Sequence, residues 1–411
     1  MNKSILIDQQ WSDGNGAQWQ SRDPVDNHPL WEGRAADSTQ VDAAVASARA
    51  AFFSWSGLTL QQRLQYVNRF VAALQENAES LANLISRESG KALWDARTEV
   101  AAMSGKAAIS LQAYEERSGS RSKVTAQGEL LLRHKPHGVL AVFGPFNFPG
   151  HLPNGHIIPA LPGGNTVVFN PSELVPAVAC AMLQLWQQAG LPPGVLNMVC
   201  GDKVTGAVLV AHPQLDGILF TGSAQTGRYL HQQFGGQPQK VLALEMGGNN
   251  PLVVEPVKDV RAALFTTLFS AFVSSGQRCP CARRLLLPAG EWGDHFQEKL
   301  VTACQQLQVA PGLADPQPFM AAVINPDAVK HLQNGLQLLQ NVGGQYLLPP
   351  RFLNESGTLM TPALMAMSDA QQAVDEELFG PVLQVYRYAD LDEAISLANA
   401  TRFGLAAGII T

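Results

Sequence analysis

The sequence predicts an α/β fold built from two doubly wound, Rossmann-like domains, and three observations support this prediction. Short apolar runs alternate with stretches of helical periodicity, at 138–143, 166–169, 195–199, 217–220 and 241–244. The runs are continuously apolar, which is typical of parallel strands that are buried on both faces. After Pro251 the alternation starts again, so the pattern predicts a second domain of the same kind.

The first third of the chain is predicted to be mainly helical. Apolar residues within 61–89 recur at helical spacing, and Gly90 is placed to end that helix. Residues 121–134 form a polar segment with an extended run at 129–132. Within the first alternating set, the clearest helix is expected at 175–188.

The second alternating set predicts strands at 252–254, 284–287 and 383–388, with helices near 259–275 and 293–308. The glycine-rich turn at 247–251 interrupts the pattern between the two sets. We therefore expect a first domain at 1–245 and a second domain at 246–411.

Composition limits the function classes. The 411 residues are 46% hydrophobic and 15% charged, which is enough for two domains with separate cores. The formal net charge of −6 leaves no basic surplus that could hold nucleic acid. No run approaches the roughly 18 to 20 apolar residues that cross a bilayer, and the N-terminus lacks the apolar core of a signal peptide. We expect a cytoplasmic protein without nucleic-acid or membrane partners.

The chain contains five cysteines, at positions 180, 200, 279, 281 and 304. Scattered thiols in a chain of this length do not form a disulfide framework. Cys279 and Cys281 are separated by one residue, a spacing that suits neither a CxxC redox pair nor the paired ligands of a zinc site, so no metal is expected. Four of the five are expected to pack in the core, and Cys279 is the candidate for chemistry.

Cys279 follows a long helical run, in a loop that also contains Gly276 and Arg278. A neighbouring positive charge lowers the pKa of a thiol from about 8.5 and raises its thiolate fraction. The alternative is a buried structural cysteine, which is the commoner fate of this residue type. Spacing alone leaves both interpretations open.

Glu245 ends the apolar run at 241–244 and precedes a glycine turn. Ligands of open α/β sheets bind at the carboxyl ends of strands. Burial at such an end would raise the pKa of Glu245 toward the range that suits a general base. The alternative is a structural carboxylate that caps the turn.

No GxGxxG fingerprint follows the first strand of the sheet. Instead, the segment TGSAQTG at 221–227 follows the run at 217–220 and opens into a helix. Its glycines would let a ligand approach the backbone, and the start of the helix offers N–H groups to a pyrophosphate. The alternative is an ordinary helix cap, which Gly and Ser often form at such junctions.

Five ordered segments resemble motifs of the aldehyde dehydrogenase superfamily: GPFNFP at 144–149, FTGS at 220–223, LEMGG at 244–248, GQRC at 276–279 and EELFGP at 376–381. The resemblance implies the fold of that family, with two Rossmann-like domains and a small oligomerisation hairpin, which would lie at 121–137. Further segments are similar to a bacterial branch that oxidises a succinylated amino-acid semialdehyde in arginine catabolism: HKPHG at 134–138, FPGHLPNGH at 148–156, EMGGNNP at 245–251 and CPCARR at 279–284.

The resemblance implies a catalytic role for three residues. The thiolate of Cys279 would attack the aldehyde and form a thiohemiacetal. The side-chain amide of Asn147, with the backbone N–H of Cys279, would stabilise the oxyanion. Glu245 would activate the water that hydrolyses the later thioester. Acylating relatives that release the product to coenzyme A lack this glutamate, so its presence favours a free acid as product.

The resemblance also implies a nicotinamide cofactor. The pyrophosphate would lie against Gly222, Ser223, Ala224, Gln225, Thr226 and Gly227. Glu173 would bind the adenosine ribose and Glu377 the nicotinamide ribose, with Phe146 and Phe379 near the nicotinamide. A carboxylate at Glu173 would accept from a free 2′-hydroxyl and repel a 2′-phosphate, so NAD is expected over NADP.

The partners that the resemblance implies are a small-molecule aldehyde and further copies of the chain. The aldehyde of that bacterial branch carries two carboxylates, and another semialdehyde is the alternative. Arg283 and Arg284 either bind such carboxylates through their planar forks or serve the structure of a strand. In its full-length form we expect a homodimer or homo-oligomer.

The chain departs from the family pattern at several places. Asn170 stands where most relatives have a lysine that contacts the adenosine ribose, so we expect NAD binding weakened on the order of 1–2 kcal/mol. Pro162 replaces an aliphatic residue, and Pro280 fixes its own φ beside Cys279 and lacks an N–H. The sequence ends at Thr411, inside an expected strand, where family members continue. A second hypothesis is therefore a fragment or shortened relative that keeps the fold and has little or no activity.

Overall fold

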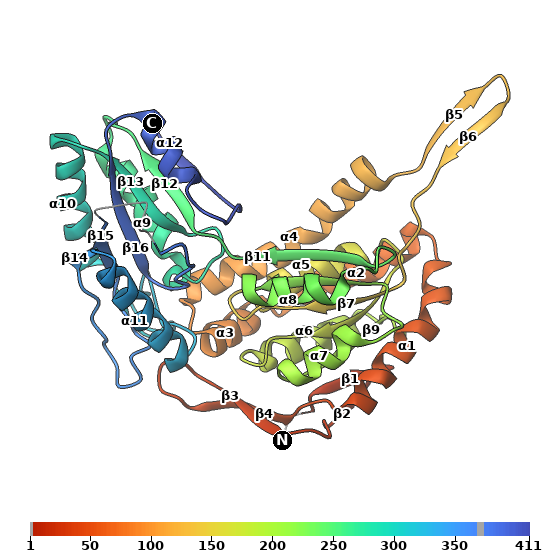
Figure 1. Cartoon of the computed structure of the whole chain (residues 1–411). Coiled ribbons are helices and arrows are strands. Elements are labelled where there is room, and N and C mark those ends of the chain that lie inside the picture. Colours follow the sequence, from red (N-terminus) through yellow and green to blue (C-terminus); the bar gives the residue numbers. More distant parts are fainter. Residues whose placement is uncertain (1–2, 368–373) are drawn as a thin grey trace. The chain divides into compact units, whose positions relative to one another are not determined.

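The computed structural model describes residues 3–367 and 374–411, and it confirms the predicted α/β fold (Figure 1). The strands are β1 (Ile5–Ile7), β2 (Gln10–Ser12), β3 (Gln18–Arg22), β4 (Pro29–Arg34), β5 (Arg121–Thr125), β6 (Gly128–Leu132), β7 (Val139–Phe143), β8 (Thr166–Asn170), β9 (Leu196–Val199), β10 (Gly217–Gly222), β11 (Val241–Met246), β12 (Asn250–Val254), β13 (Ala282–Pro288), β14 (Gln345–Leu348), β15 (Ala363–Ala366), β16 (Val382–Tyr388) and β17 (Gly408–Ile410).

The helices are α1 (Ser38–Ser56), α2 (Leu60–Glu76), α3 (Ala78–Ser89), α4 (Leu93–Ser118), α5 (His151–Ala160), α6 (Pro176–Gln188), α7 (Lys203–Ala211), α8 (Ala224–Phe234), α9 (Val260–Phe272), the 3-10 helix η1 (Val273–Gly276), α10 (Glu291–Gln306), α11 (Pro326–Asn341) and α12 (Leu391–Asn399). The chain divides into two compact units. The first contains the residues up to Arg22, Pro29–Glu88 and Ala96–Glu245, and the second contains Asp23–His28, Ser89–Asp95 and Met246–Thr411.

The first unit is built around a sheet with the strand order β11-β10-β7-β8-β9-β1-β2. Strands β10, β7, β8 and β9 pair in parallel, as the continuous apolar runs predict. Helix α1 packs on β8 and β9, and α5 packs on β7. The carboxyl ends of the parallel strands lie at one edge of the sheet, and the candidate residues Asn147, Glu173 and Ser223 follow directly after three of these ends.

The first third of the chain is mainly helical, as predicted, because α1 to α4 make up more than half of it, and residues 5–34 add the four strands β1 to β4. One prediction for this part is wrong. The single helix predicted at 61–89 is divided into α2 and α3, because Asn77 (φ −107°, ψ 15°) leaves the helical conformation. The Asn77 amide donates to the carbonyl of Ala73 (2.9 Å), which stabilises this break. The apolar periodicity continues across the break and therefore does not reveal it.

The second unit contains a sheet with the strand order β14-β15-β16-β13-β12-β17. Its pairs are parallel except for the antiparallel pair of β14 with β15. Successive residues of the central strands pack on opposite faces: Leu285 and Val385 pack with α9 and α10, whereas Leu286 and Tyr386 pack with α11 and α12. Helices therefore cover both faces, as a doubly wound fold requires.

Strands β5 and β6 form an antiparallel hairpin that extends from the end of α4, away from the rest of the first unit (Figure 1). Lys123 lies opposite Leu130 and Val124 opposite Glu129, so neighbouring positions point to opposite faces. The exposed fractions of its apolar side chains are large, at 81% for Val124, 62% for Leu130, 51% for Leu131 and 54% for Leu132. Exposed apolar side chains on both faces of a hairpin are typical of a surface that another protein chain covers.

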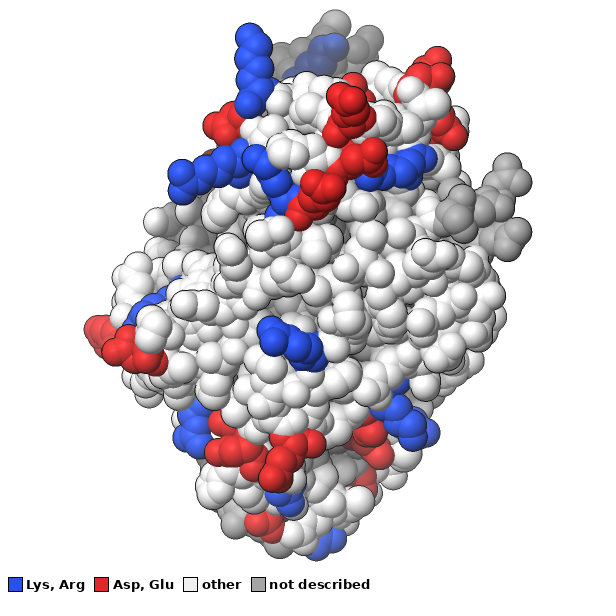
Figure 2. Space-filling view, turned by 90° about the vertical axis from the view of Figure 1, so that its left-hand side faces the viewer, with Lys and Arg blue, Asp and Glu red and all other residues white. Residues whose placement is uncertain are grey.

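Acidic and basic side chains are interspersed on the face that Figure 2 shows. Most of them lie toward the upper and lower parts of this view, and a few lie near its centre and left margin. The formal net charge of −6 is thus not gathered into a patch of one sign on this face. Among the described residues, no helix is both long enough and apolar enough to cross a membrane.

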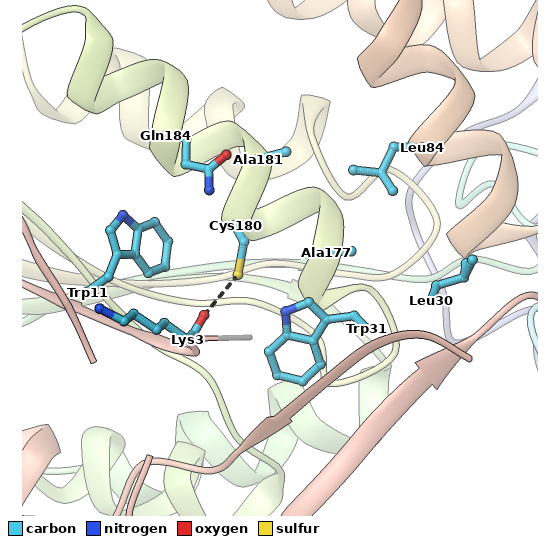
Figure 3. A pocket seen from close by; sticks show the side chains of 9 residues that line it. All are labelled: Lys3, Trp11, Leu30, Trp31, Leu84, Ala177, Cys180, Ala181 and Gln184. Carbon is cyan, nitrogen blue, oxygen red and sulfur yellow. Dashed lines mark hydrogen bonds between the residues drawn. The ribbon is translucent and has the colours of Figure 1, made fainter. Parts of the chain in front are cut away.

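The first unit also contains a cavity of about 520 Å³ (Figure 3). Its lining includes Trp11 from β2, Trp31 from β4 and Cys180 from α6. The Cys180 thiol donates to the carbonyl oxygen of Lys3 (3.7 Å), as Figure 3 shows. Cys180, one of the four cysteines expected to pack in the core, therefore borders an open space.

Candidate active site

Cys279 lies in the second unit, in the loop between η1 and β13, and its side chain is half-buried. Asn250 on β12 holds this loop, because its Nδ2 donates to the carbonyls of Cys279 (2.6 Å) and Cys281 (2.9 Å). The N–H of Cys281 donates to the carbonyl of Arg278 (3.1 Å) and closes a turn. Pro280 lies within this turn and is exposed.

The backbone just before Cys279 adopts a series of left-handed conformations, at Ser274 (φ +54°), Ser275 (φ +55°) and Gly276 (φ +70°). This conformation costs a residue other than glycine about 1–2 kcal/mol, so the serines need support. The Ser274 hydroxyl donates to Asp95 (2.5 Å), and the Ser275 hydroxyl donates to a backbone carbonyl (2.8 Å). A side chain at position 276 would collide with the carbonyl of Gly380, so this position requires glycine.

The charge of Arg278 is compensated. Its Nη2 donates to Asp95 Oδ1 (2.6 Å), and its Nε donates to Ser274 Oγ (2.8 Å). The Asp95 side chain is fully buried. A buried carboxylate therefore partly offsets the charge of Arg278, and the guanidinium also supports the strained backbone. The effect of this charge on the Cys279 thiol stays a prediction.

Arg283 and Arg284 are buried structural residues, so the alternative of substrate carboxylate binding is wrong. Arg283 donates through Nη1 to the carbonyl of Gly276 (2.6 Å) and through Nη2 to that of Arg278 (3.0 Å). Arg284 donates to three backbone carbonyls, those of Asn249 (2.9 Å), Leu397 (2.8 Å) and Ala398 (2.8 Å). Each guanidinium thus joins neighbouring loops to β13 through hydrogen bonds to their backbone carbonyls.

The Glu377 carboxylate lies in the second unit, 3.7 Å from Arg283 Nη2, and 15% of its side chain is exposed. Burial raises its pKa, while Arg283 and the N–H of Gly248 act in the opposite direction. A side chain at Gly247 would collide with this carboxylate, so the glycine turn fits around it. Glu377 Oε1 is buried and accepts no hydrogen bond from the described residues, so it can accept one from a ligand. Phe379 is half-buried, with its ring 5.4 Å from the Arg283 guanidinium carbon.

Asn147 is buried in the first unit, in the loop between β7 and α5, and Phe146 beside it is half-buried. The end of this loop is fixed by Glu99 of α4, whose Oε1 accepts from the N–H groups of Gly150 (2.9 Å) and His151 (3.1 Å). A buried carboxylate thereby caps the N-terminus of α5, where the helix dipole favours negative charge. The cap sets where the helix begins, four residues after Asn147.

Glu245 is the next-to-last residue of β11, an edge strand of the first sheet, and its side chain is exposed. The expectation of a buried Glu245 is therefore wrong. The residues of β11 before it are only half-buried, because the strand has a neighbour on one side alone. A run of apolar residues does not distinguish an edge strand from a central one.

The segment at 221–227 begins α8. Ser223 is its N-cap, and Ser223 Oγ accepts from the N–H of Thr226 (3.2 Å). The structure therefore contains the helix cap that the sequence leaves as an alternative, and a helix start of this kind still presents backbone N–H groups to an anion. Glu173 is exposed, and the indole of Trp19 donates to its carbonyl (3.0 Å), which anchors the loop after β8.

Asn170 ends β8 and is buried, with 7% of its surface exposed. Its Nδ2 donates to the carbonyl of Val199 on β9 (2.8 Å). The side chain thus joins two strands of the sheet instead of extending outward. Pro162 contributes its carbonyl as the acceptor for Arg63 Nε (2.8 Å).

The sequence does not reveal the supporting residues Asp95, Glu99 and Asn250. Each acts on a loop far away in the sequence, and no local pattern marks such a contact. The described residues contain no group of three or more His, Cys, Asp or Glu side chains that could hold a metal ion.

Comparison with known proteins supports the family resemblance. The pattern of the aldehyde dehydrogenase family matches residues 11–411. The N-succinylglutamate 5-semialdehyde dehydrogenase of Hahella chejuensis is 51% identical over 411 residues, 100% of this chain and 84% of the relative. The enzyme of the same name from Chromobacterium violaceum is 52% identical over 408 residues, 99% of this chain and 84% of the relative. The crystal structure of an NAD-dependent aldehyde dehydrogenase from Sinorhizobium meliloti has a TM-score of 0.94 at 26% identity, covering 100% of this chain and 83% of that one. The chain belongs to the aldehyde dehydrogenase family and is an enzyme that oxidises aldehydes with a nicotinamide cofactor.

Proposed function

We propose that the enzyme oxidises N-succinylglutamate 5-semialdehyde to N-succinylglutamate with NAD, in bacterial arginine catabolism. The observation that carries the proposal is the loop of Cys279, whose thiol is half-buried while the other four cysteines are buried. The names of two relatives that are 51% and 52% identical support the substrate.

In the proposed reaction the Cys279 thiolate attacks the aldehyde carbon, and the resulting thiohemiacetal oxyanion accepts from the Asn147 amide and the Cys279 N–H. The nicotinamide, when bound, supplies the acceptor for the hydride of that carbon. Loss of the hydride leaves a thioester on Cys279. Glu245 takes a proton from water, the resulting hydroxide attacks the thioester carbon, and the acid leaves as the thiolate is restored. The exposure of Glu245 gives water direct access to its carboxylate.

The residues present fit a dinucleotide. The segment from Gly222 to Gly227 at the start of α8 would hold the pyrophosphate, through backbone N–H groups other than those of Thr226 and Gly227, which donate to Ser223. Glu377 Oε1 has no donor among the described residues and would accept from a ribose hydroxyl. The exposed carboxylate of Glu173 would accept from the adenosine 2′-hydroxyl and repel a 2′-phosphate, which supports NAD over NADP. Phe146 and Phe379 would pack near the nicotinamide.

The roles of Cys279 and Glu245 are tested by following NADH absorbance. We expect no NADH from Cys279→Ala, whereas Cys304→Ala, a change at a buried thiol of α10, keeps the activity. Glu245→Gln should give a burst of NADH equal to the enzyme concentration and then a slow phase, because the thioester forms but is not hydrolysed. Activity that survives Cys279→Ala would refute the nucleophile, and a Glu245→Gln reaction without a burst would refute the assigned base.

The substrate and cofactor are tested by comparing kcat/KM across aldehydes and between NAD and NADP. The proposal expects the succinylated semialdehyde to exceed other semialdehydes and uncharged aldehydes, and NAD to exceed NADP. Glu173→Gln should lower the ratio of kcat/KM with NAD to kcat/KM with NADP, because it removes the repulsion of the 2′-phosphate. A higher kcat/KM for another semialdehyde would replace the proposed substrate, and no turnover of any aldehyde would favour the inactive relative.

Asn170 is proposed to lower the affinity for NAD relative to a lysine at this position. The side chain of Asn170 is uncharged, and its amide already donates to the carbonyl of Val199. It therefore offers the adenosine ribose no positively charged donor, which supports the proposal. Asn170→Lys should tighten NAD binding on the order of 1–2 kcal/mol and lose about 1 kcal/mol of unfolding free energy from the missing bond. Calorimetric NAD titration and urea unfolding separate the two effects; an unchanged affinity for NAD contradicts the proposal.

We further propose that the hairpin of β5 and β6 joins copies of this chain in a homodimer or larger homo-oligomer. Its exposed Val124, Leu130, Leu131 and Leu132 support this, because burial of such side chains favours association. Leu130→Lys should reduce the molar mass measured by light scattering, whereas Ile109→Lys, at a position 60% exposed on α4, should not. A Leu130→Lys protein with unchanged mass would argue against the hairpin as the contact.

A further inference from the structure

One face of α4 runs along the first turns of α5 within the first unit. Glu99 Oε1 accepts from the N–H groups of Gly150 and His151 at 2.9 and 3.1 Å. A Cβ atom at Gly150 would lie 2.5 Å from the sulfur of Met103, and one at Gly155 would lie 3.9 Å from the ammonium of Lys106. Positions 99, 103 and 106 share one helix face, because they are spaced by four and three residues. Lys106 is therefore placed beside α5, one turn beyond Met103 and two turns beyond Glu99.

The ammonium of Lys106 has no anionic partner within the part of the chain that the structure describes. Its side chain is half-buried, so it is partly removed from water. Gly155 contributes no side chain next to it, and this leaves room at the ammonium. A half-buried charge without a partner is costly, and such a charge is typical of a site that binds an opposite charge.

His156 contributes no charge next to Lys106. Burial, with a smaller effect of the Lys106 charge, lowers the pKa of His156 to about 4, so the imidazole is neutral at pH 7. Its Nε2 lies 3.0 Å from the hydroxyl of Thr221, which fixes the ring against β10. The positive charge beside this part of α5 is thus that of Lys106.

The position of Lys106 relative to the loop of Asn147 suits a substrate with a remote carboxylate. Helix α5 begins at His151, four residues after Asn147, and Gly155 lies one turn further along, about 6 Å by the helical rise. An aldehyde whose oxygen accepts from Asn147 would reach Lys106 only through a chain of several atoms. The succinylated semialdehyde has such a chain and carries carboxylates on it.

We propose that the Lys106 ammonium binds a carboxylate of the substrate and thereby selects aldehydes that carry a negative charge at a distance from the reacting carbon. This inference rests on the proposed function, because it assigns a substrate contact of the same site. Lys106 would act as a specificity residue and would take no part in the chemistry at Cys279.

Lys106→Met and Lys106→Arg test the inference, because methionine keeps the length without the charge and arginine keeps the charge. For N-succinylglutamate 5-semialdehyde we expect Lys106→Met to lower kcat/KM roughly 10- to 100-fold through KM, the range for one charged hydrogen bond. For propanal, which carries no carboxylate, kcat/KM should stay unchanged. Lys106→Arg should keep most of the preference. An equal loss on both aldehydes would show a structural role, and an undiminished preference would show that the carboxylate binds elsewhere; either result overturns the inference.

A binding measurement separates this inference from the proposed function. Titration of the wild type and Lys106→Met with N-succinylglutamate, followed by calorimetry, requires no turnover. Weaker binding to the methionine variant supports the Lys106 contact, and equal binding overturns it, whatever the activity. A wild type that forms no NADH from any aldehyde would refute the proposed function alone. Gly155→Leu offers a steric control that should weaken the same binding, because its side chain would occupy the space at the ammonium.

Discussion

The loop of Cys279 and the turn at 221–227 are supported in different ways. In the second unit, the loop is fixed by Asp95 and Asn250, which are buried groups from distant parts of the sequence, and by the buried Arg283, which follows the loop directly. In the first unit, the turn is fixed by Ser223, whose hydroxyl accepts from an N–H three residues later. The loop has to place one side chain, whereas the turn presents backbone N–H groups that every helix start provides. Placement of a side chain thus requires long-range support, and a helix N-terminus requires only a local cap.

Asp95→Ala should have the largest effect, because it removes the partner of both Arg278 and Ser274. Loss of one member of a buried ion pair leaves the other charge uncompensated, so we expect about 3 kcal/mol less unfolding free energy, measured in urea. The kcat should also fall, because the strained backbone before Cys279 loses its support. Glu79→Ala is the matched control, since Glu79 pairs with Arg97 at 2.7 Å on the surface, and it should change little. If both variants lost the same unfolding free energy and kcat, the buried pair of Asp95 would be no more important for the loop than the surface pair of Glu79.

Gly276→Ala should have the next largest effect. An alanine at φ +70° costs about 1–2 kcal/mol, and its side chain would also collide with the carbonyl of Gly380. Gly236→Ala measures the conformational cost alone, because Gly236 has φ +81° and no heavy atom lies within 4 Å of a Cβ atom placed there. We expect thermal unfolding to shift in both variants, further in Gly276→Ala, and the kcat to fall only in Gly276→Ala. Loss of kcat in Gly236→Ala would show that the loop is not specially constrained.

Glu88 extends the comparison, because the first unit also contains a buried carboxylate that caps a helix. It accepts from the N–H groups of Ala177 (2.9 Å) and Val178 (2.8 Å) at the start of α6, and from the Ser21 hydroxyl (2.5 Å). Burial nevertheless raises the pKa of Glu88 to about 7. Since this value exceeds that of the unfolded chain, the protonated form stabilises the fold below pH 4.5, and this contribution is lost as the pH rises toward 7.

The measurement is the unfolding free energy of the wild type and Glu88→Gln between pH 4 and 8. The difference between them should change on the order of 2 kcal/mol from about pH 4.5 to 7 and stay constant above, because glutamine stays neutral. Ser21→Ala removes a hydrogen bond that lowers the pKa, so it should move this window to higher pH. A difference that is independent of pH would show that the helix N–H groups outweigh the burial of Glu88.

Ser223→Ala should have the smallest effect. Loss of the cap is expected to cost about 1 kcal/mol in unfolding free energy and to raise the Kd for NAD by a similar free energy. Ser223→Asn, which keeps a capping oxygen, should recover the stability. Calorimetric titration with NAD provides the affinity. If Ser223→Ala lowered kcat more than Asp95→Ala does, the local cap would matter more for catalysis than the long-range support of the Cys279 loop.

The same contrast explains how much the sequence could predict. The strands of the two predicted alternating sets, the helix after Gly222 and the end of α3 at Gly90 depend on local periodicity and turn residues, and the structure confirms them. The pairing of Asp95 with Arg278 joins residues 183 positions apart, and no local signal reports it. The residues around Cys279 therefore do not reveal that a carboxylate offsets the charge of Arg278.

Local sequence patterns also do not predict which strand lies at the edge of a sheet or which groups a buried arginine binds. Glu245 is exposed because β11 is an edge strand, and the order of strands is a property of the whole sheet. Arg283 binds carbonyls of two loops that the sequence places on either side of it. The family resemblance identifies the candidate residues, since spacing alone leaves Cys279 and Glu245 with structural alternatives.

The cavity beside Cys180 has a practical consequence for chemical labelling of this enzyme. Cys180 borders that open space, so a small thiol reagent should modify it slowly in addition to the half-buried Cys279. Trp11 and Trp31 line the same cavity, and their fluorescence would report the modification. Counts of reactive thiols, or occupancy by an electrophilic inhibitor, are therefore best measured in a Cys180→Ala background, in which one equivalent of label corresponds to Cys279.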